Sequence, residues 1–269
     1  MVRQALDQLI SRISLDPAVR AVGRSGGHRS LPEPDAGDID LFVYCTEIPH
    51  AGERTACLAR LGADVDQVCI GALAGGNWGV ADSLLLRGIE TWVMYFTVEQ
   101  LWAEIEATLA GRSVARVENY YYPVGRLAML QRMEVLYDPD GLFAEVADAI
   151  REYPAPLLRA QLAFHLPRMH DEEDFGRAVE RQDLLFYHFV FDLALDHVLQ
   201  ALFALNQTYF PSRKRSFDYI AGFARKPARC EERLRMAVEL GGRPDTLAES
   251  YRIWQELTRE LAALDEPVQ

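Results

Sequence analysis

The sequence predicts an α+β protein, with a mixed-sheet domain over residues 1–114 and an all-helical domain over residues 115–269. Three observations give this prediction. Runs rich in β-branched and aromatic residues, which are typical of strands, are concentrated in the first part of the chain. Apolar residues at helical spacing fill the second part, between breaks such as Pro154 and Pro211. A length of 269 residues allows two modest domains, each with its own core.

The elements of the first domain follow in order along the chain. An opening helix that ends near Asp16-Pro17 is predicted by apolar residues at helical spacing: Leu6, Leu9, Ile10 and Ile13. Strands are predicted over 19–22, 38–43, 65–70, 79–86 and 89–96, with a loop over 29–37 and a helix over 49–61. Thr97 and Gln100 form a capping box for the next helix, which ends at Gly111.

The second domain is predicted to contain helices and no strands. Its helices are expected over 120–131, 139–151, 155–168, 174–206, 214–224, 227–240 and 245–263. The sequence shows no internal repeat at a fixed period and no low-complexity segment. This half of the chain is therefore expected to form one helical bundle.

Composition and charge narrow the class of protein. The content of 49% apolar and 25% charged residues is typical of a soluble globular protein. A net charge of -12 argues against a nucleic-acid partner and suits a cationic small molecule better. The apolar segment 184–205 is interrupted by charged residues and histidines, which argues against a membrane span. Four cysteines without a C-x-x-C pair, and an amino terminus unlike a signal peptide, predict a cytoplasmic protein.

Two carboxylates, Asp38 and Asp40, occur at i and i+2 in the apolar run Asp38-Ile39-Asp40-Leu41-Phe42-Val43. Side chains alternate along a strand, so the two acids project from one face while Ile39, Leu41 and Val43 face a core. Two like charges side by side on a half-buried strand repel each other unless a cation compensates them. The pair therefore predicts a divalent-metal site; the alternative is a polar strand end beside a Gly-Asp turn.

A family resemblance rests on this pair and on the turn that precedes it. An apolar strand, the turn Val22-Gly23-Arg24-Ser25-Gly26-Gly27, a spacer and then Asp-apolar-Asp-apolar are found over residues 18–45. This order resembles the signature of the DNA polymerase beta-like nucleotidyltransferase superfamily, in particular the small bacterial enzymes that adenylylate antibiotics. In that family the turn is usually Gly-Ser, whereas here Arg24 stands before Ser25.

The resemblance implies roles for these residues. It implies that Asp38 and Asp40 bind Mg²⁺, and that Ser25 helps to hold the phosphates of ATP or another nucleoside triphosphate. The residues around it, Gly23, Arg24 and Gly26, would complete the phosphate-binding turn, because backbone N–H groups of a glycine-rich turn form a concavity for anions. Nucleotidyl transfer needs such groups, since catalysis there consists largely of positioning and charge neutralisation.

A third carboxylate normally completes such a site, and Glu90 is the first candidate. Glu90 is the one acid of the strand predicted over 89–96. It would complete the metal site or accept the proton of the attacking hydroxyl; the alternative is a solvent-facing residue at a strand start. Asp82 and Asp66 are the other candidates, and they rank below Glu90 because the family places its third acid on a strand after a short turn.

Two groups of residues in the second domain are candidates for ligand contacts. The segment Arg213-Lys214-Arg215 follows Pro211 in an otherwise acidic chain, and Lys214 is the preferred contact to the triphosphate. The alternative is an ordinary solvated loop. Asp192 and Asp196 share one face of the apolar helix at i, i+4 and would bind substrate amines, or simply form its polar side.

The sequence thus predicts a Mg²⁺-dependent nucleotidyltransferase that moves a nucleoside monophosphate from a nucleoside triphosphate to a hydroxyl and releases pyrophosphate. By the resemblance, the acceptor is a small, hydroxylated, cationic molecule such as an aminoglycoside- or lincosamide-like antibiotic. One alternative is transfer onto a protein or a transfer RNA in a toxin-antitoxin setting. The other is an inactive nucleotide-binding or partner-binding module, which Arg24 and the unsettled third acid favour.

Overall fold

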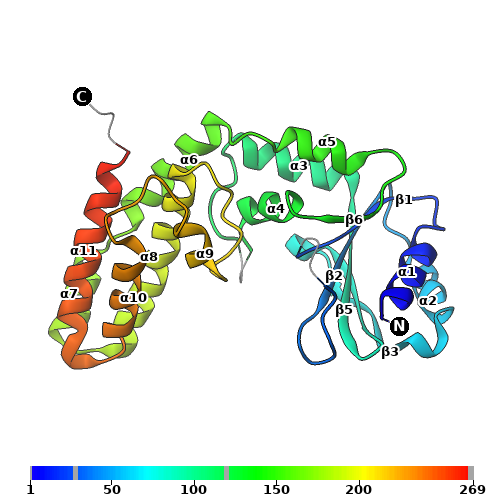
Figure 1. Cartoon of the computed structure of the whole chain (residues 1–269), viewed down its shortest axis with the longest axis horizontal. Helices are drawn as coiled ribbons and strands as arrows, with labels where there is room; N and C mark the ends of the chain where they lie inside the picture. Colours follow the sequence, from blue (N-terminus) through cyan, green and yellow to red (C-terminus); the bar gives the residue numbers. More distant parts are fainter. Residues whose placement is uncertain (1, 27–29, 118–120, 266–269) are drawn as a thin grey trace. The chain divides into compact units, whose positions relative to one another are not determined.

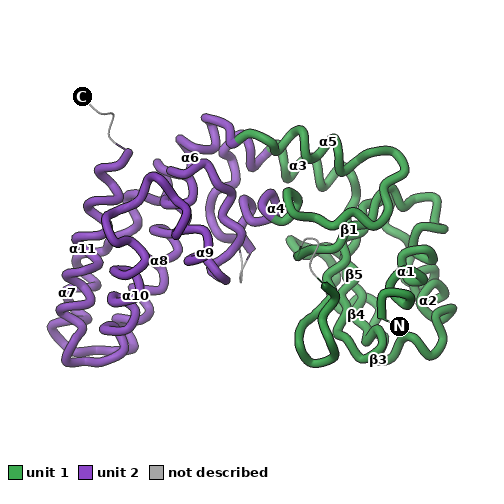
Figure 2. The backbone as a smooth tube through the Cα atoms, in the orientation of Figure 1, with its two compact units in different colours: residues 1–106, 129–152 green, residues 107–128, 153–269 purple. Residues whose placement is uncertain are grey.

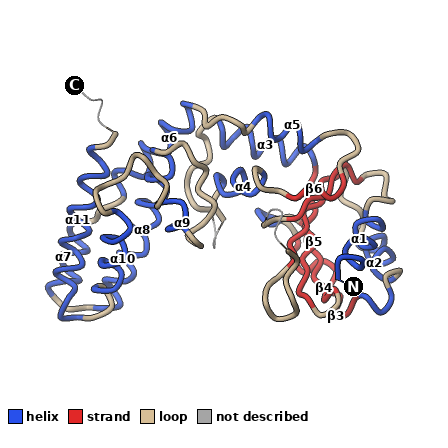
Figure 3. Tube along the Cα trace, viewed as in Figure 1, coloured by secondary structure: helices blue, strands red, loops and turns tan. Residues whose placement is uncertain are grey.

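The structure, a computed structural model, describes residues 2–26, 30–117 and 121–265. It divides into two compact units (Figure 2). Unit 1 comprises residues 1–106 and 129–152, and unit 2 comprises residues 107–128 and 153–269. The predicted α+β class is confirmed, because the strands lie in unit 1 and unit 2 is helical (Figure 3).

Unit 1 combines a six-stranded sheet with helices, as Figure 1 shows. Its strands are β1 (Val19–Arg24), β2 (Ile39–Cys45), β3 (Val65–Ala74), β4 (Val80–Leu86), β5 (Ile89–Thr97) and β6 (Glu134–Tyr137). Its helices are α1 (Val2–Ile13), α2 (Ala51–Ala59), most of α3 (Val98–Leu109) and α5 (Leu142–Ala149), with the short 3₁₀ turns η1 (Gly62–Asp64) and η2 (Gly76–Trp78). The predicted capping box of α3 is confirmed, since Thr97 and Gln100 each accept a hydrogen bond from the other's backbone N–H.

The sheet is mixed and has the strand order β3-β4-β5-β2-β1-β6. β2 and β5 are parallel, and the remaining neighbours are antiparallel. One face carries Ile39, Leu41 and Val43, which are fully buried beneath α1 and α2, as the alternation of β2 predicts. The other face carries aromatic residues, and Phe143 of α5 packs against Tyr44 there, with ring centroids 5.7 Å apart. We call these the helix-pair face and the aromatic face.

The segment 129–152 corrects the predicted domain boundary at residues 114 and 115. It carries β6 and α5 back to unit 1, and β6 pairs with β1 at the edge of the sheet. The prediction of an all-helical second half is therefore wrong here. The physical reason is that β6 has four residues, too few for a periodic signal, and its pairing with β1 bridges more than a hundred residues of sequence.

Unit 2 consists of helices and turns in the part of the chain that the structure describes. They are the start of α4 (Pro123–Leu130), α6 (Ala155–His165), η3 (Leu166–Arg168), α7 (Glu172–Glu180), α8 (Leu184–Leu205), α9 (Ser216–Ile220), α10 (Cys230–Leu240), η4 (Pro244–Thr246) and α11 (Leu247–Ala263). The single helix predicted over 174–206 is two helices. Gln182 has φ 52° between them, and Asp183 caps α8 by accepting a hydrogen bond from the Phe186 N–H.

Helix α8 forms the core of unit 2. Trp254 of α11 and Phe175 of α7 pack against its aromatic residues, among them Phe191. Among the described helices, α8 alone is long and apolar enough to cross a membrane, and 67% of its most apolar window is buried within the structure.

A buried histidine pair joins α6 and α8. The Nδ1 atoms of His165 and His197 lie 2.8 Å apart, and His165 has no exposed surface. Burial, with a smaller contribution from the neighbouring His197, lowers the pKa of His165 to about 3, and burial also lowers the pKa of His197. Both rings are therefore expected to stay neutral at pH 7 in the folded protein.

This pair predicts that unit 2 loses stability as the solution becomes mildly acidic. An unfolded histidine binds a proton below about pH 6.5, whereas the folded pair resists protonation until lower pH. Stability linked to the pair is thus complete above about pH 6.5 and falls progressively from there toward pH 3. Urea denaturation between pH 7 and pH 5 measures it; the double variant His165→Phe/His197→Leu should flatten the dependence, and His188→Gln, at an exposed position, should not. An unchanged slope in the double variant would contradict the prediction.

Candidate functional site

The predicted turn and the predicted acid strand meet in unit 1. β1 ends at Arg24 and runs antiparallel to β2, so Ser25 lies beside Asp40. The Ser25 N–H donates to the backbone oxygen of Asp40 at 3.0 Å, and Ser25 Oγ donates to Asp40 Oδ2 at 3.2 Å. Asp40 is partly buried, and Asp38, one residue before β2, is exposed. The structure therefore brings the serine of the turn into direct contact with the second acid of the pair.

Glu90 lies on the same face of the sheet as Asp40. In the parallel register of β2 and β5, Asp40 is opposite Trp92 and Ile39 is opposite Thr91. Because side chains alternate along a strand, Glu90 and Trp92 both share the aromatic face with Asp40. Trp92 Nε1 donates to Glu90 Oε1 at 2.9 Å. The exposed Glu90 carboxylate is thus held next to the residue that faces Asp40.

The structure separates the other two candidate acids from Asp40. Asp82 is opposite Val93 in the β4–β5 pairing, so its side chain is on the helix-pair face. There it is fully buried and forms an ion pair with Arg54. Asp66 is on β3, three strands from β2, and at about 4.8 Å per strand the separation is about 14 Å. Neither acid can share a metal ion with Asp40.

The side chain of Arg24 lies on the opposite face of the sheet from Ser25 and Asp40. Arg24 is opposite Leu41, so it lies on the helix-pair face, where it is 4% exposed and donates through Nε to Glu134 Oε2 at 2.6 Å. The guanidinium of Arg24 is therefore engaged within the protein, and a part for Arg24 in the phosphate-binding turn through its backbone stays a prediction. The side chain of Arg24 links β1 to β6, because Glu134 is its register partner there.

The two described glycines of the turn have different roles. Gly26 has φ +86°, and a Cβ placed on it would meet nothing within 4 Å, so its backbone is open to a ligand. Gly23 instead faces Met133 and Phe143 on the aromatic face: a Cβ there would lie 2.9 Å from Phe143 Cζ and closer still to Met133. Gly27 lies outside the described residues. Gly23 is thus a packing residue, and Gly26 remains a candidate for the phosphate-binding turn.

This packing predicts that Gly23→Ala destabilises the protein. The added methyl group must displace the buried Met133 side chain, and overpacking of this kind costs about 1 to 3 kcal/mol. Gly52→Ala in α2 is the matched control, since a Cβ there meets nothing within 4 Å, and the change should be neutral or slightly stabilising. Equilibrium urea unfolding of both variants measures the difference; equal free energies of unfolding would contradict the role of Gly23.

The carboxylates around Ser25 and Asp40 suit Mg²⁺ that is bound together with a phosphate ligand. Within the described ranges, no group of three or more His, Cys, Asp or Glu side chains is placed to share a metal ion. The three acids Asp38, Asp40 and Glu90 therefore do not form a closed cluster. Mg²⁺ commonly uses one or two carboxylates and takes its other ligands from phosphate and water. Asp38 and Asp40 fit that arrangement, and Glu90 is the nearest additional acid by register.

Lys214 lies in unit 2, on the loop between α8 and α9. Its side chain is exposed, and its Nζ forms no ion pair with any residue that the structure describes. The two neighbouring cations behave differently: Arg213 binds Asp192 and Asp196, and Arg215 binds Asp218. Contact between Lys214 and a triphosphate stays a prediction.

Asp196 is the centre of a hydrogen-bond network in unit 2. Its Oδ1 accepts a hydrogen bond from Tyr122 at 2.7 Å and another from Arg213 Nε, and its Oδ2 accepts one from Arg116 at 2.9 Å. Burial, and then the hydrogen bond to Asp196, raise the pKa of Tyr122 to about 12. Asp196 is thus occupied by protein donors, and the more exposed Asp192 also pairs with Arg213, so a role of either acid in substrate binding stays a prediction. The i, i+4 spacing of the two acids was the one sequence signal for this network.

Comparisons with known proteins give a partial family match. The model of the domain of unknown function DUF4037 matches residues 121–215. No curated protein matches the chain. Among solved structures, the chain is similar to a nucleotidyltransferase-like protein from Exiguobacterium sibiricum 255-15, with 9% identity and a TM-score of 0.45. That similarity covers 98% of this chain and 78% of the other.

Proposed function

We propose that this protein is a nucleotidyltransferase that moves a nucleoside monophosphate from ATP, or another nucleoside triphosphate, to a hydroxyl group and releases pyrophosphate. One observation carries the proposal: Ser25 of the turn hydrogen-bonds to Asp40 on the face that also bears Glu90. A phosphate-binding hydroxyl next to a carboxylate pair is what positioning a triphosphate requires.

The residues of the proposed site would have three different roles: metal binding, phosphate binding and proton acceptance. Asp38 and Asp40 would hold Mg²⁺, which neutralises charge on the triphosphate oxygens when it is bound. Ser25 Oγ and the open backbone at Gly26 would hold phosphate oxygens. Glu90 uses one carboxylate oxygen to accept the Trp92 hydrogen bond, and its exposed position suits it to take the proton of the attacking hydroxyl.

The proposed acceptor is a small, hydroxylated, cationic molecule of the aminoglycoside or lincosamide kind. The net charge of -12 favours the approach of a cation over that of a nucleic acid. The partly exposed indole of Trp92, beside Asp40, offers a flat apolar surface to such a molecule. Transfer onto a protein or a transfer RNA is the alternative with a macromolecular acceptor.

A binding module without turnover is the second candidate. Two observations favour it: Trp92 rather than an acid faces Asp40, and the three candidate carboxylates form no closed cluster in the described part of the chain. Such a module would bind a triphosphate through the same serine turn. It would release no pyrophosphate with any acceptor.

An assay with and without Mg²⁺ distinguishes a nucleotidyltransferase from a module that only binds the triphosphate. The purified protein is incubated with each common nucleoside triphosphate, labelled at the α-phosphate, and with acceptor panels of antibiotics, total protein and transfer RNA. We expect pyrophosphate release and label transfer with Mg²⁺ and neither with excess EDTA, because the triphosphate charge is then not neutralised. Label on the antibiotic supports the favoured acceptor. Saturable triphosphate binding without release under every condition would support the module instead.

A further inference from the structure

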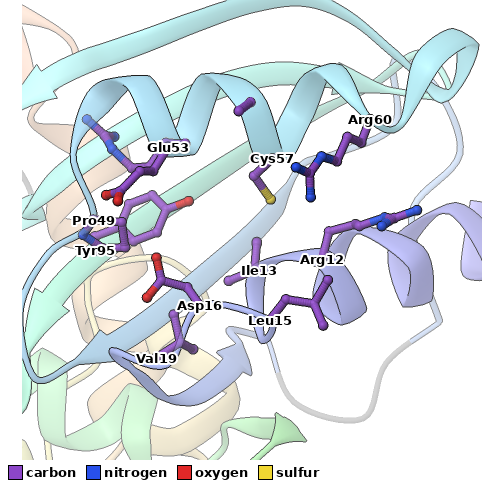
Figure 4. A pocket seen from close by; sticks show the side chains of 12 residues that line it. Arg12, Ile13, Leu15, Asp16, Val19, Pro49, Glu53, Cys57, Arg60 and Tyr95 are labelled. Carbon is purple, nitrogen blue, oxygen red and sulfur yellow. The ribbon is translucent and has the colours of Figure 1, made fainter.

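Unit 1 has a pocket on the helix-pair face of its sheet (Figure 4). Asp40 lies on the opposite, aromatic face. The pocket has a volume of about 260 Å³ and lies between the end of α1, the helix α2 and the strand β5. Tyr95 of β5 is one of its lining residues, and its register partner Val43 belongs to the core beneath α1 and α2. The nucleotidyltransferase proposal assigns this pocket no role.

The pocket has one basic end and one acidic end. Figure 4 shows Arg60 and Arg12 at one end, Glu53 and Asp16 at the other, and Cys57 between them. The polarity follows from the helices: Glu53 is in the first turn of α2 and Arg60 is its C-cap residue. Each end therefore gathers two like charges from two different segments of the chain, and the fifth charged lining residue, Arg54, is already paired with the buried Asp82.

The charges at the two ends are only partly satisfied by the protein. The guanidinium groups of Arg12 and Arg60 form no ion pair with any described residue, and both also line an adjoining hollow. Asp16 accepts one hydrogen bond, from the Ala18 N–H, through Oδ1. Glu53 accepts one, from the His50 N–H, through Oε2. Each acid keeps its second carboxylate oxygen for another donor.

Tyr95 supplies a polar group between the two ends. The Tyr95 residue as a whole is 3% exposed, the guanidinium of Arg54 lies over its ring at 5.2 Å from the centroid, and no hydrogen bond joins its hydroxyl to a described residue. Figure 4 shows this hydroxyl directed into the space beside Cys57. The hydroxyl oxygen is not one of the fully buried side-chain atoms without a partner, so it borders the pocket, where it can exchange a hydrogen bond to water for one to a ligand.

We propose that this pocket binds a short linear peptide with free ends, a dipeptide in the simplest case. The ammonium group would lie between Asp16 and Glu53, the carboxylate at Arg12 and Arg60, and the peptide oxygen at the Tyr95 hydroxyl. Buried and half-buried apolar residues, Ile13, Val19 and Pro49 among them, would contact small side chains.

The spacing of the charges fits this ligand. Glu53 and Arg60 are seven residues apart on α2, which is a rise of about 10 Å. A dipeptide spans about 7 Å, and a hydrogen bond of about 3 Å at each end extends its reach to about 13 Å. The difference of about 3 Å from the rise lies within what the long, flexible side chains of Glu53 and Arg60 can take up. A free α-amino acid carries the two charges but has no peptide oxygen to accept a hydrogen bond from the Tyr95 hydroxyl.

Isothermal titration calorimetry with alanylalanine tests the proposal. We expect saturable one-to-one binding, and binding at least about tenfold weaker for alanine, for N-acetyl-alanylalanine and for alanylalanine amide, each of which lacks the peptide group or one charge. No saturable heat up to about 10 mM alanylalanine would overturn the proposal. Equal binding of either blocked peptide would overturn it as well.

Protein variants locate the site. Glu53→Gln keeps an acceptor for the His50 N–H and removes the charge, and Arg60→Gln removes a charge at the other end. Each of these two variants should weaken binding about tenfold. Tyr95→Phe, which removes one hydrogen bond to a neutral group, should weaken binding by a smaller factor. Glu145→Gln and Arg159→Gln, at exposed positions elsewhere, match the charge changes and should leave binding unchanged. Equal losses in the controls, or none at Glu53 and Arg60, would refute the assignment.

Cys57 gives a second readout that does not depend on calorimetry. Its half-buried thiol lies inside the pocket, so bound peptide should slow its alkylation while leaving that of the exposed Cys69 unchanged. Mass spectrometry of the two cysteine peptides measures both rates in one sample. Equal rates at Cys57 with and without saturating alanylalanine would contradict binding at this place. The outcome is independent of nucleotide transfer, because neither assay contains a triphosphate.

Discussion

Asp40→Asn is expected to reduce magnesium-dependent pyrophosphate release at least about a thousandfold, which corresponds to about 4 kcal/mol of transition-state stabilisation. The amide keeps an oxygen to accept the Ser25 hydrogen bond, so the turn should keep its geometry. It loses the negative charge that a divalent cation needs. The rate of pyrophosphate release at saturating Mg²⁺ and triphosphate measures the effect.

Two further variants make this result specific to the proposed site. Asp66→Asn is the matched control: it makes the same chemical change three strands from β2 and should leave the rate unchanged. Glu90→Gln keeps the acceptor for the Trp92 indole and removes the base, so it should lower the rate by about ten- to a hundredfold. Activity of Asp40→Asn close to that of the unmodified protein would remove the basis of the enzymatic proposal.

Asp82→Ala is expected to destabilise the protein by about 3 to 5 kcal/mol. Asp82 has no exposed surface, and it accepts hydrogen bonds from Arg54 Nη1 and from the Gly71 N–H. Burial raises its pKa, while Gly71 and Arg54 act to lower it. Removal of Asp82 would leave the guanidinium of Arg54, which is 6% exposed, without its carboxylate. The free energy of unfolding in urea measures the loss.

The double variant Arg54→Met/Asp82→Leu distinguishes a lost ion pair from simple loss of volume. Replacement of both partners by apolar residues removes the buried charge together with its counterion, and such changes are often close to neutral. We expect the double variant to recover most of the stability that Asp82→Ala loses. A double variant as unstable as Asp82→Ala would show that the ion pair is not the cause.

The parts of the site that could be predicted from sequence are those that depend on neighbouring residues. Alternation along β2 placed Ile39, Leu41 and Val43 in the core and Asp40 on the opposite face, whereas Asp38, predicted within the strand, lies one residue before it. The choice of Glu90 over Asp82 also agrees with the faces of the sheet, since Asp82 is on the helix-pair face. Register alone decides that point, and a slip of one residue would exchange the two faces.

Long-range partners could not be predicted. Arg24 reads as a substitution within a phosphate-binding turn, but in the fold it is the partner of Glu134, 110 residues away. Asp196 reads as one of two acids on a helix, yet its carboxylate is occupied by Arg116, Tyr122 and Arg213. The ion pair of Arg54 and Asp82 gave no signal at all. In each case the donor and the acceptor belong to different elements.

By itself, the sequence determined the α+β class, the strand that bears Asp40, the capping box of α3 and the turn with its serine, because each depends on residues close together in the chain. Tertiary structure decided which acids share a face, that the Arg24 side chain pairs with Glu134 of β6, that residues 129–152 return to the sheet, and that a two-ended pocket forms against α2. The physical reason is that strand pairing and the burial of charge depend on contacts between distant segments, and local propensity does not encode those contacts.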